Sequence, residues 1–467
     1  MAHTRREFIR RTCCTAAALG VASSFSRFGL INALAQATSE YRALVCIFLF
    51  GGNDSNNMIV SLDSNVTTGY PNYLKIRGAL TSGGLALDQG SLLPITLRTP
   101  QAKYGNSTLF GLHPRLTDFQ RLFQSNKLAF LANVGTLSAP ITRAQYLAKS
   151  VAVPANLFSH SDQQQEWQTS QASGFSPTGW AGRMADKLQP LNVNSQFPPI
   201  TSVAGTAIFC TGLQTRPFAI IPSATGVAAP GLTDPDKGAR LASLNQLLTF
   251  DTGLSLIQSA SSITKSALAD SSIISQALAA APPLQTVFPT TNNSIGVQLQ
   301  QIAKLLQVRS AIGLTRQIFF CSLGGFDTHS DQINTQDRLF SQLGPAIAAF
   351  YNATVELNLE RQVTTFTMSD FSRTFQQASG GGTDHAWGSV QLMVGGAVQG
   401  GDIYGTLAQP ALGTGDDSGG NGRWIPTTSI DQYGATLGTW FGVQPSDLSS
   451  VFPSLANFPT SNLGFLG

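Results

Sequence analysis

Three apolar runs of strand length stand out along the chain, and each is followed within a few residues by an aspartate. The runs cover residues 43–50, 318–323 and 362–368. The aspartates that follow them are Asp54, Asp327 and Asp370. Runs that are apolar on both faces favour buried parallel strands. Because open α/β sheets bind ligands beyond the carboxyl ends of their strands, we predict that these three strand ends converge on one polar site.

Between these runs, leucine and isoleucine recur at the spacing of amphipathic helices. The predicted helices lie near residues 115–124, 241–248, 257–282, 295–306 and 339–357. The alternation of strands with helices predicts an α/β fold with a central, mostly parallel sheet. Residues 63–112 show little periodicity, and we expect them to form a long surface excursion.

No break in composition divides residues 38–467, so we expect one large domain decorated by long loops. Within it, residues 188–236 are punctuated by proline and glycine and hold short strand candidates at 206–210 and 218–221. We predict that this segment is irregular and caps one edge of the sheet.

The first 37 residues have the pattern of a targeting segment rather than of a folded element. A twin-arginine run at residues 4–10 precedes an apolar stretch at 13–21 and a small-residue cleavage site at 33–35. This order predicts a signal peptide for the twin-arginine translocase. The folded chain would then be exported to the periplasm or outside the cell.

The charge balance changes once this leader is set aside. The whole chain carries a formal net charge of +3. Residues 1–35 hold five arginines and one glutamate, so their removal takes the net charge to about −1. This balance offers no electrostatic case for binding nucleic acid or an anionic membrane. No later run approaches 18 apolar residues, so we predict no transmembrane span after cleavage.

Three cysteines follow the leader, namely Cys46, Cys210 and Cys321. Their wide spacing makes neither a zinc knuckle nor a disulfide framework. Cys46 and Cys321 lie inside apolar runs, where a thiol behaves as a small buried hydrophobe. A single pairing with Cys210 stays open.

Histidine is scarce, and most of the histidines lie in polar loops beside Asp, Ser or Gly. After the leader the histidines are His113, His160, His329 and His385. We interpret His113, just before a predicted helix, as structural or peripheral. The candidate metal ligands are Asp54, Asp327, His329, Asp370 and His385. Mixed carboxylate and imidazole ligands suit a divalent ion such as Zn²⁺, Mn²⁺ or Mg²⁺.

Two further residues allow both a structural and a catalytic interpretation. Ser159 stands at the start of a predicted helix, where it suits an N-cap, as Ser161 would, or a nucleophile facing backbone N–H groups. Arg373 follows Asp370 by three residues and suits either a phosphate or sulfate oxyanion or a salt bridge to Asp384.

The motifs occur in a recognisable order along the chain. They are residues 51–54, 159–160, 324–329, 369–373, 383–388 and 423–428. Together with the twin-arginine leader, this series resembles the DUF1501 family over nearly the whole chain. That family is similar to the alkaline phosphatase-like superfamily. The resemblance implies a three-layer sandwich with a bimetal hydrolytic site at the carboxyl ends of the strands.

Carried over by position, the resemblance also implies roles for individual residues. Asp54 resembles the first metal-ligating aspartate, and Ser159 stands where the nucleophile falls in chain order. Asp327 with His329 resembles the pair that binds the second metal. Asp370 and His385 resemble the aspartate of the following strand and a late histidine ligand. Because Phe371 stands where related hydrolases carry histidine, one ion is an alternative to two.

These observations favour an exported, metal-dependent hydrolase that acts on small phosphate or sulfate esters. In this hypothesis Ser159 attacks the ester, and Arg373 neutralises charge on the transferred group. The alternative is a noncatalytic relative that binds a protein partner in the cell envelope. A charged fraction of only 11% suits such large protected surfaces.

Overall fold

A nine-stranded sheet organises the chain from Arg42 to Gly467. The computed structural model describes residues 40–192, 195, 197–222, 237–250 and 253–467. The predicted leader, residues 1–37, therefore lies outside the described residues.

The order of the strands in the sheet differs from their order in the sequence. Across the sheet the strands are β11 (Ile403–Tyr404), β5 (Leu128–Gly135), β10 (Ser389–Val394), β9 (Val363–Ser369), β1 (Arg42–Phe50), β8 (Arg316–Gly324), β6 (Ile200–Ser202) and β7 (Phe218–Ala219), with β12 (Thr428–Ser429) also paired to β5. β10 runs antiparallel to β5 and β9, whereas the other pairings are parallel. The prediction of a mostly parallel α/β sheet is confirmed.

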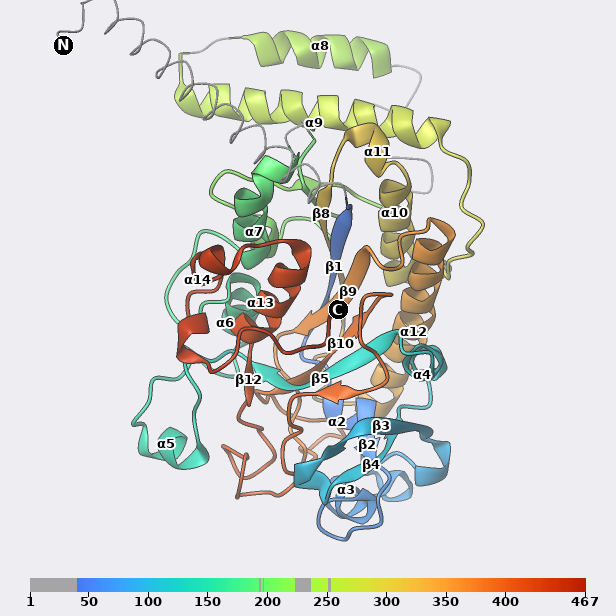
Figure 1. Cartoon of the computed structure of the whole chain (residues 1–467), viewed down its shortest axis with the longest axis vertical. Coiled ribbons are helices and arrows are strands. Elements are labelled where there is room, and N and C mark those ends of the chain that lie inside the picture. Colours follow the sequence, from blue (N-terminus) through green and yellow to red (C-terminus); the bar gives the residue numbers. More distant parts are fainter. Residues whose placement is uncertain (1–39, 193–194, 196, 223–236, 251–252) are drawn as a thin grey trace, which may run out of the picture. The chain divides into compact units, whose positions relative to one another are not determined.

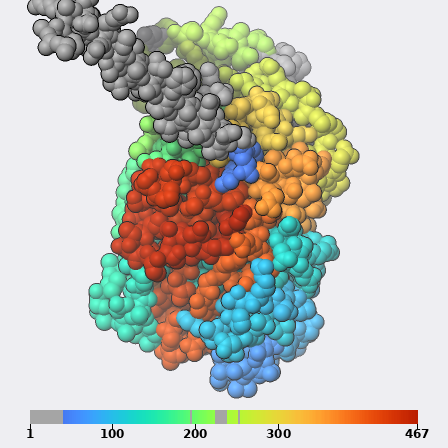
Figure 2. All heavy atoms as spheres, in the orientation of Figure 1, coloured from blue at the N-terminus to red at the C-terminus, as the bar shows by residue number. Residues whose placement is uncertain are grey.

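Helices cover both faces of this sheet and complete three layers (Figure 1). One face carries α6 (His160–Thr169), α7 (Trp180–Leu188), α13 (Ile430–Phe441) and α14 (Leu448–Val451). The other carries α4 (Thr117–Gln124), α10 (Ser294–Gln307) and α12 (Gln332–Glu356). The remaining helices are α2 (Ser55–Met58), α3 (Tyr70–Arg77), α5 (Arg143–Ala148), α8 (Lys237–Thr249), α9 (Ser255–Ala280) and α11 (Arg309–Ile312). In Figure 2 the C-terminal residues, coloured red, form a continuous surface on the face in view.

The core is densest where β1 crosses the middle of the sheet. From Ala43 to Phe48 every side chain of β1 is fully buried, because helices cover both of its faces. Leu44, Cys46 and Phe48 pack in one cluster with α7 and α13. Alternate residues of a strand point to opposite faces, so a continuous apolar run is what such a strand requires.

The long surface excursion expected over residues 63–112, where the sequence shows little periodicity, contains regular structure. This stretch supplies α3 and two strands, β3 (Leu93–Gln101) and β4 (Ser107–Leu112), which join β2 (Ile59–Ser61) in a small antiparallel sheet. In β3 buried Ile95 and Leu97 alternate with exposed neighbours. That period of two is the signal of a half-buried strand, and it is present in the sequence.

The predicted strand at 206–210 is wrong, since residues Ile208–Cys210 form a 3-10 helix. Phe209 is buried there, edge-on against Trp180 at 4.7 Å between ring centroids. The strand at 218–221 is confirmed as the short edge strand β7. Part of the segment predicted as a cap thus extends the sheet edge through β6 and β7, and residues 223–236 lie outside the described part.

Cys46, Cys210 and Cys321 are all buried and free. Within the described residues, none of the helices combines the length and apolar character that crossing a membrane requires.

His113 is a buried packing residue between α4 and α12, as its interpretation from sequence anticipates. Its ring meets Phe340 edge-on at 5.0 Å between centroids, and its Nδ1 accepts the N–H of Arg115 at 3.2 Å. Burial lowers the pKa of His113 to about 4, because the charged imidazole would lose its hydration.

A buried ion pair docks α3 against the end of β1. Arg77 is fully buried, and its guanidinium lies 2.5 Å from Asp54 Oδ2. A second N–H of Arg77 donates to the carbonyl of Phe375 at 3.2 Å. Asp54 is also the N-cap of α2, accepting the backbone N–H of Asn56 at 3.0 Å.

Removal of one partner of this ion pair should strongly destabilise the fold. An Arg77→Met variant leaves the Asp54 carboxylate buried without its counterion, and we expect a loss of about 3–5 kcal/mol in unfolding free energy. Urea denaturation followed by circular dichroism measures it. The matched control is Arg121→Met, which breaks an exposed ion pair with Asp118 and should change stability by about 0–1 kcal/mol. Equal effects of the two variants would contradict the role of the buried pair.

His113 should make the fold sensitive to mild acid. The unfolded imidazole takes up a proton below its ordinary pKa of 6.5, whereas the folded one does so only near 4. The stabilising contribution of the neutral, buried His113 is therefore fully present above pH 6.5 and is lost as the pH falls towards 4. Between pH 7 and pH 5 the contribution falls by about 2 kcal/mol. In His113→Phe, which cannot titrate, the decline in unfolding free energy should be smaller by that amount. A decline equal to that of the parent would refute the assignment.

Candidate metal centre

The carboxyl ends of β1, β8 and β9 lie side by side, as the sequence predicts. Phe50 pairs in register with Gly324, and Leu49 pairs with Ser369. The segments that carry Asp54, Asp327 and Asp370 therefore start from neighbouring points of the sheet edge. Gly51 is needed here, because its φ is +112° and a Cβ atom would lie 2.4 Å from the backbone nitrogen of Asp327.

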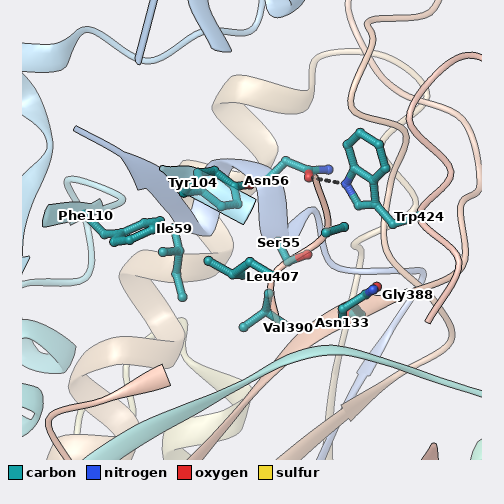
Figure 3. A pocket seen from close by; sticks show the side chains of 12 residues that line it. Ser55, Asn56, Ile59, Tyr104, Phe110, Asn133, Gly388, Val390, Leu407 and Trp424 are labelled. Carbon is teal, nitrogen blue, oxygen red and sulfur yellow. Dashed lines mark hydrogen bonds between the residues drawn. The ribbon is translucent and has the colours of Figure 1, made fainter. Parts of the chain in front are cut away.

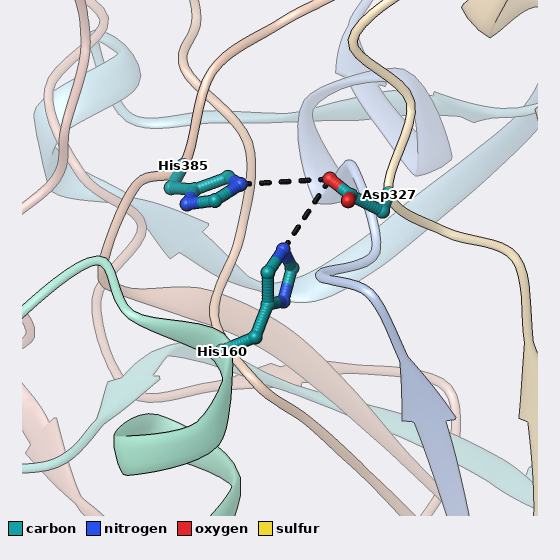
Figure 4. A group of neighbouring side chains, drawn as sticks. All are labelled: His160, Asp327 and His385. Carbon is teal, nitrogen blue, oxygen red and sulfur yellow. Dashed lines mark ion pairs between the residues drawn. The ribbon is translucent and has the colours of Figure 1, made fainter.

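Three side chains offer ligand atoms to one point. His160, Asp327 and His385 each place one such atom within 4.8 Å of the others (Figure 4). Oδ1 of Asp327 lies 3.3 Å from Nε2 of His160 and 3.5 Å from Nε2 of His385. His329 borders the same point, with its Nε2 3.1 Å from Oδ1 of Asp327 and 2.9 Å from Nε2 of His385.

These spacings fit a tetrahedral ion. Metal bonds of about 2.0–2.1 Å to nitrogen or oxygen place neighbouring ligand atoms roughly 3.3 Å apart. Oδ1 of Asp327 lies 3.3 Å from Nε2 of His160 and 3.5 Å from Nε2 of His385, close to that value, and the three ligand atoms all lie within 4.8 Å of one another. In addition, Nε2 of His160 is a buried nitrogen without a hydrogen-bond partner among the described residues. An imidazole and carboxylate set of this kind suits Zn²⁺ or another transition ion.

Hydrogen bonds on the far side of two imidazoles fix which nitrogen faces the site. Nδ1 of His160 lies 2.6 Å from Oδ2 of Asp370, and Nδ1 of His385 lies 2.6 Å from the carbonyl oxygen of Phe158. Both partners are acceptors, so each Nδ1 donates its proton and each Nε2 keeps a lone pair. This is the outer arrangement that metal-binding histidines use. Phe371 is buried against both rings, with centroids 4.7 Å from each.

The contacts of His160, His385 and Asp327 shift the pKa of each of these side chains. The hydrogen bond that His160 donates to the Asp370 carboxylate raises the pKa of His160. Burial lowers the pKa of His385. Burial alone would raise the pKa of Asp327, but the hydrogen bond and charge of Arg373 outweigh it and lower that pKa to about 2. Asp327 thus stays ionised, as a metal ligand would need to be.

Asp54, predicted as a metal ligand, lies outside this group. Its oxygens accept Arg77 and two N–H groups of Asn56, and Gln332 donates to Oδ2 at 2.5 Å. A carboxylate has about four lone-pair positions, and these four donors fill them. In this structure, ligation by Asp54 would require breaking a buried ion pair.

Asp370, the second aspartate predicted as a ligand, accepts a hydrogen bond from Nδ1 of His160, on the side of the ring that faces away from the site. It is fully buried, and its oxygens accept the N–H of Gly51 at 3.2 Å and the amide of Gln164 at 2.8 Å in addition to the bond from His160. It touches the imidazole of His160 and not the convergence point of the ligand atoms.

The side chain of Arg373, predicted to bind an oxyanion or to form a salt bridge, has protein partners in this structure. The side chain is fully buried and donates to the carbonyls of Gly51, Gly52 and Thr383 and to the carboxylate of Asp327. The predicted alternative, a salt bridge to Asp384, is replaced by the pair with Asp327.

Ser159 is the N-cap residue of α6, the helix that carries His160. Its side chain makes no capping hydrogen bond and instead donates to Oδ2 of Asp162 at 2.5 Å. The hydrogen bonds from Asn156 and Ser159 lower the pKa of Asp162, so that carboxylate remains an acceptor. Ser159 is half-buried and adjacent in sequence to a ligand.

His160 is the site residue to which the sequence analysis assigned no ligand role. The available signal was its position: it directly follows Ser159 at a hydroxyl-rich helix start, and it is one of few histidines in the chain. Its contribution depends on α6 meeting the ends of β8 and β9, which are more than 150 residues away in sequence.

A cavity of about 30 Å³ near the same loops is a different kind of site. It is lined by Ser55, Asn133 and Gly388 among others, and Trp424 donates there to Asn56 at 3.0 Å (Figure 3). None of its lining residues is an acid, a histidine or a cysteine. Its volume suits one water molecule rather than a metal ion.

Several solved structures are similar to this chain at low identity. The lipoteichoic acid synthase LtaP from Listeria monocytogenes is 6% identical, with a TM-score of 0.34 over 90% of this chain and 76% of that one. The soluble domain of lipooligosaccharide phosphoethanolamine transferase A from Neisseria meningitidis is 8% identical, with a TM-score of 0.33 over 89% and 93%. The PsFucS1 sulfatase from Pseudoalteromonas sp. is 9% identical, with a TM-score of 0.31 over 90% and 71%.

No curated protein sequence matches this chain. The family model described as "Protein of unknown function (DUF1501)" matches residues 41–417, which include the β1, β8 and β9 strand ends and every proposed ligand. The chain therefore belongs to the DUF1501 family.

Proposed function

We propose that this chain is a hydrolase of phosphate or sulfate esters that uses one divalent metal ion and acts after twin-arginine export. The ion would be held by His160, Asp327 and His385. The observation that carries the proposal is the convergence of their ligand atoms, with each imidazole oriented by a hydrogen bond at Nδ1.

One ion fits the charges better than two. Asp54 and Asp370, which a second ion would require, already have protein partners at their oxygens. Arg373 also lies among these carboxylates, since Asp327, Asp54 and Asp370 all act on its charge. A built-in guanidinium thus supplies the positive charge that a second cation would bring.

With only three ligands from the chain, a bound ion would keep a position for substrate, as catalytic rather than structural metal sites do. A divalent ion bound there would supply Lewis acidity for an ester oxygen. His329 borders the open position and is half-exposed, so we assign it to proton exchange with the leaving group.

An anionic ester suits the electrostatics of the site. Asp327 and Arg373 neutralise one another, so neutral imidazoles and a dication leave a net positive centre. Ser159 begins the ten-residue helix α6, whose amino end adds favourable partial charge for a nucleophile and for an oxyanion. Ser159 would attack phosphorus or sulfur, and Asp162 would accept its proton.

Metal content tests the ligand set directly. We expect the purified chain to hold about one divalent ion, as a mononuclear tetrahedral site does. His160→Ala and His385→Ala should lose most of it by elemental analysis. The control His113→Gln replaces a histidine outside the group and should retain the ion. Chelation should abolish hydrolysis of aryl phosphates or sulfates. A folded chain with neither ion nor turnover would refute the enzyme and favour an envelope-binding protein.

A second prediction separates the nucleophile from the metal. Ser159→Ala should lower kcat by about a thousandfold or more while the bound ion remains, because the attacking oxygen is lost but the ligands stay. Ser161→Ala is the matched control, as its hydroxyl lies 3.2 Å from that of Ser159 at the same helix start. Steady-state kinetics with an aryl ester measure both. Unchanged turnover in Ser159→Ala would exclude it as the nucleophile.

A further inference from the structure

The ligand His385 owes its orientation to a backbone group in a distant loop. Its Nδ1 lies 2.6 Å from the carbonyl oxygen of Phe158, more than 200 residues earlier in the chain. A carbonyl only accepts, so this contact places the proton on Nδ1 and the lone pair on Nε2. Whatever holds the Phe158 carbonyl in place therefore decides whether His385 can bind a metal.

The backbone of Phe158 does not hold this position by its own preference. Its φ is +73°, in the left-handed region that bulky residues rarely adopt. Asn156, two residues earlier, has a φ of +48°. A strained backbone persists only where surrounding contacts over-determine it, and such positions cluster at functional sites.

Arg423, in the loop between β11 and β12, provides those contacts. Its guanidinium carbon lies 4.4 Å from the centroid of the Phe158 ring, within the range of a cation–π interaction. Its Nε donates to the backbone carbonyl of His385 at 2.8 Å. One side chain thus holds both the ring of Phe158 and the backbone of His385.

The backbone of Arg423 is fixed in turn. Its N–H donates to Oδ1 of Asp417 at 3.0 Å, and its carbonyl accepts the N–H of Ser418 at 2.9 Å. Phe158 also packs against a small apolar cluster of Leu137, Trp387 and Ile425. The backbone of Arg423 is therefore fixed, so its side chain can hold the loop of Phe158 and the loop of His385 together.

We propose that Arg423 is a positioning residue of the metal centre, which holds the Phe158 carbonyl against Nδ1 of His385. This inference rests on the proposed metal site. It assigns Arg423 no contact with substrate or metal. Its effect passes through the tautomer and orientation of His385.

The test measures metal affinity rather than turnover. The full chain is stripped of metal and titrated with Co²⁺ in competition with a chelator, and the visible absorption of bound Co²⁺ reports its geometry. Arg423→Met should raise the dissociation constant about 10- to 100-fold, the usual effect of removing an outer partner of a metal-binding histidine. Arg423→Lys, which keeps the charge over the ring, should fall between parent and Arg423→Met.

Two further variants keep the result interpretable. Arg98→Met is the matched control. Arg98 lies in β3 and, like Arg423, donates to a backbone carbonyl, in this case that of Gly400. It should leave the dissociation constant within about twofold of the parent, since it touches no ligand or outer partner. Phe158→Leu keeps an apolar side chain but removes the ring under Arg423. It should weaken Co²⁺ binding about tenfold, and it carries the test if Arg423→Met fails to fold.

The outcomes separate this inference from the proposed function. If Arg423→Met keeps the affinity and the Co²⁺ absorption of the parent, the positioning role of Arg423 is overturned while the metal site stands. If that variant does not fold, the same result in Phe158→Leu decides. A parent chain that binds no Co²⁺ or Zn²⁺ would overturn both. Weakened Co²⁺ binding with unchanged thermal stability of the metal-free chain would support the positioning role over a general structural one.

Discussion

Charge balance around Arg373 is the constraint on which the strand-end region depends. The guanidinium is fully buried, and burial lowers the pKa of Arg373 while the neighbouring carboxylates oppose that change. A buried charge is tolerated only where it is paired and hydrogen-bonded. Arg373 meets this condition through the carbonyls of Gly51 and Gly52 and the carboxylate of Asp327. It therefore ties the end of β1 to the end of β8.

This constraint also explains why the aspartates take different roles. Asp54 and Asp370 are buried and have filled their oxygens with protein donors, whereas the side chain of Asp327 is 48% exposed. Asp327 alone combines ionisation, exposure and three neighbouring imidazole nitrogens. The polar ends of three strands thus produce one candidate ligand, one acid that orients an imidazole and one structural ion pair.

A network of side chains couples these roles. Gln332, at the start of α12, donates to Asp54 and accepts from the hydroxyls of Thr328 and Thr383. The carbonyl of Thr383 in turn accepts from Arg373. Since each member is buried, loss of any one leaves an unsatisfied partner, and the metal-site loops would lose a shared support.

The chain's local patterns determined the sheet and most of its helices. Continuous apolar runs of strand length favour central strands, and stripes at helical spacing favour helices that pack on one face, so the residues themselves predict β1, β8, β9 and α12. In the small sheet, β3 carries a short alternation around Ile95 and Leu97 that the sequence analysis missed, whereas β4 carries none. The strand-end pattern also marked Asp327 as a candidate, and the scarcity of histidine in polar loops marked His385.

Tertiary structure alone decided which polar residues act together. A carboxylate has the same appearance in sequence whether its partner is a buried arginine, an imidazole or an ion. Asp54 meets Arg77 and Asp370 meets His160 only after helices far apart in the sequence dock on the sheet. Long-range contacts of this kind depend on packing rather than on local pattern, and for that reason the sequence pointed to the site but could not divide its acids into ligands and supports.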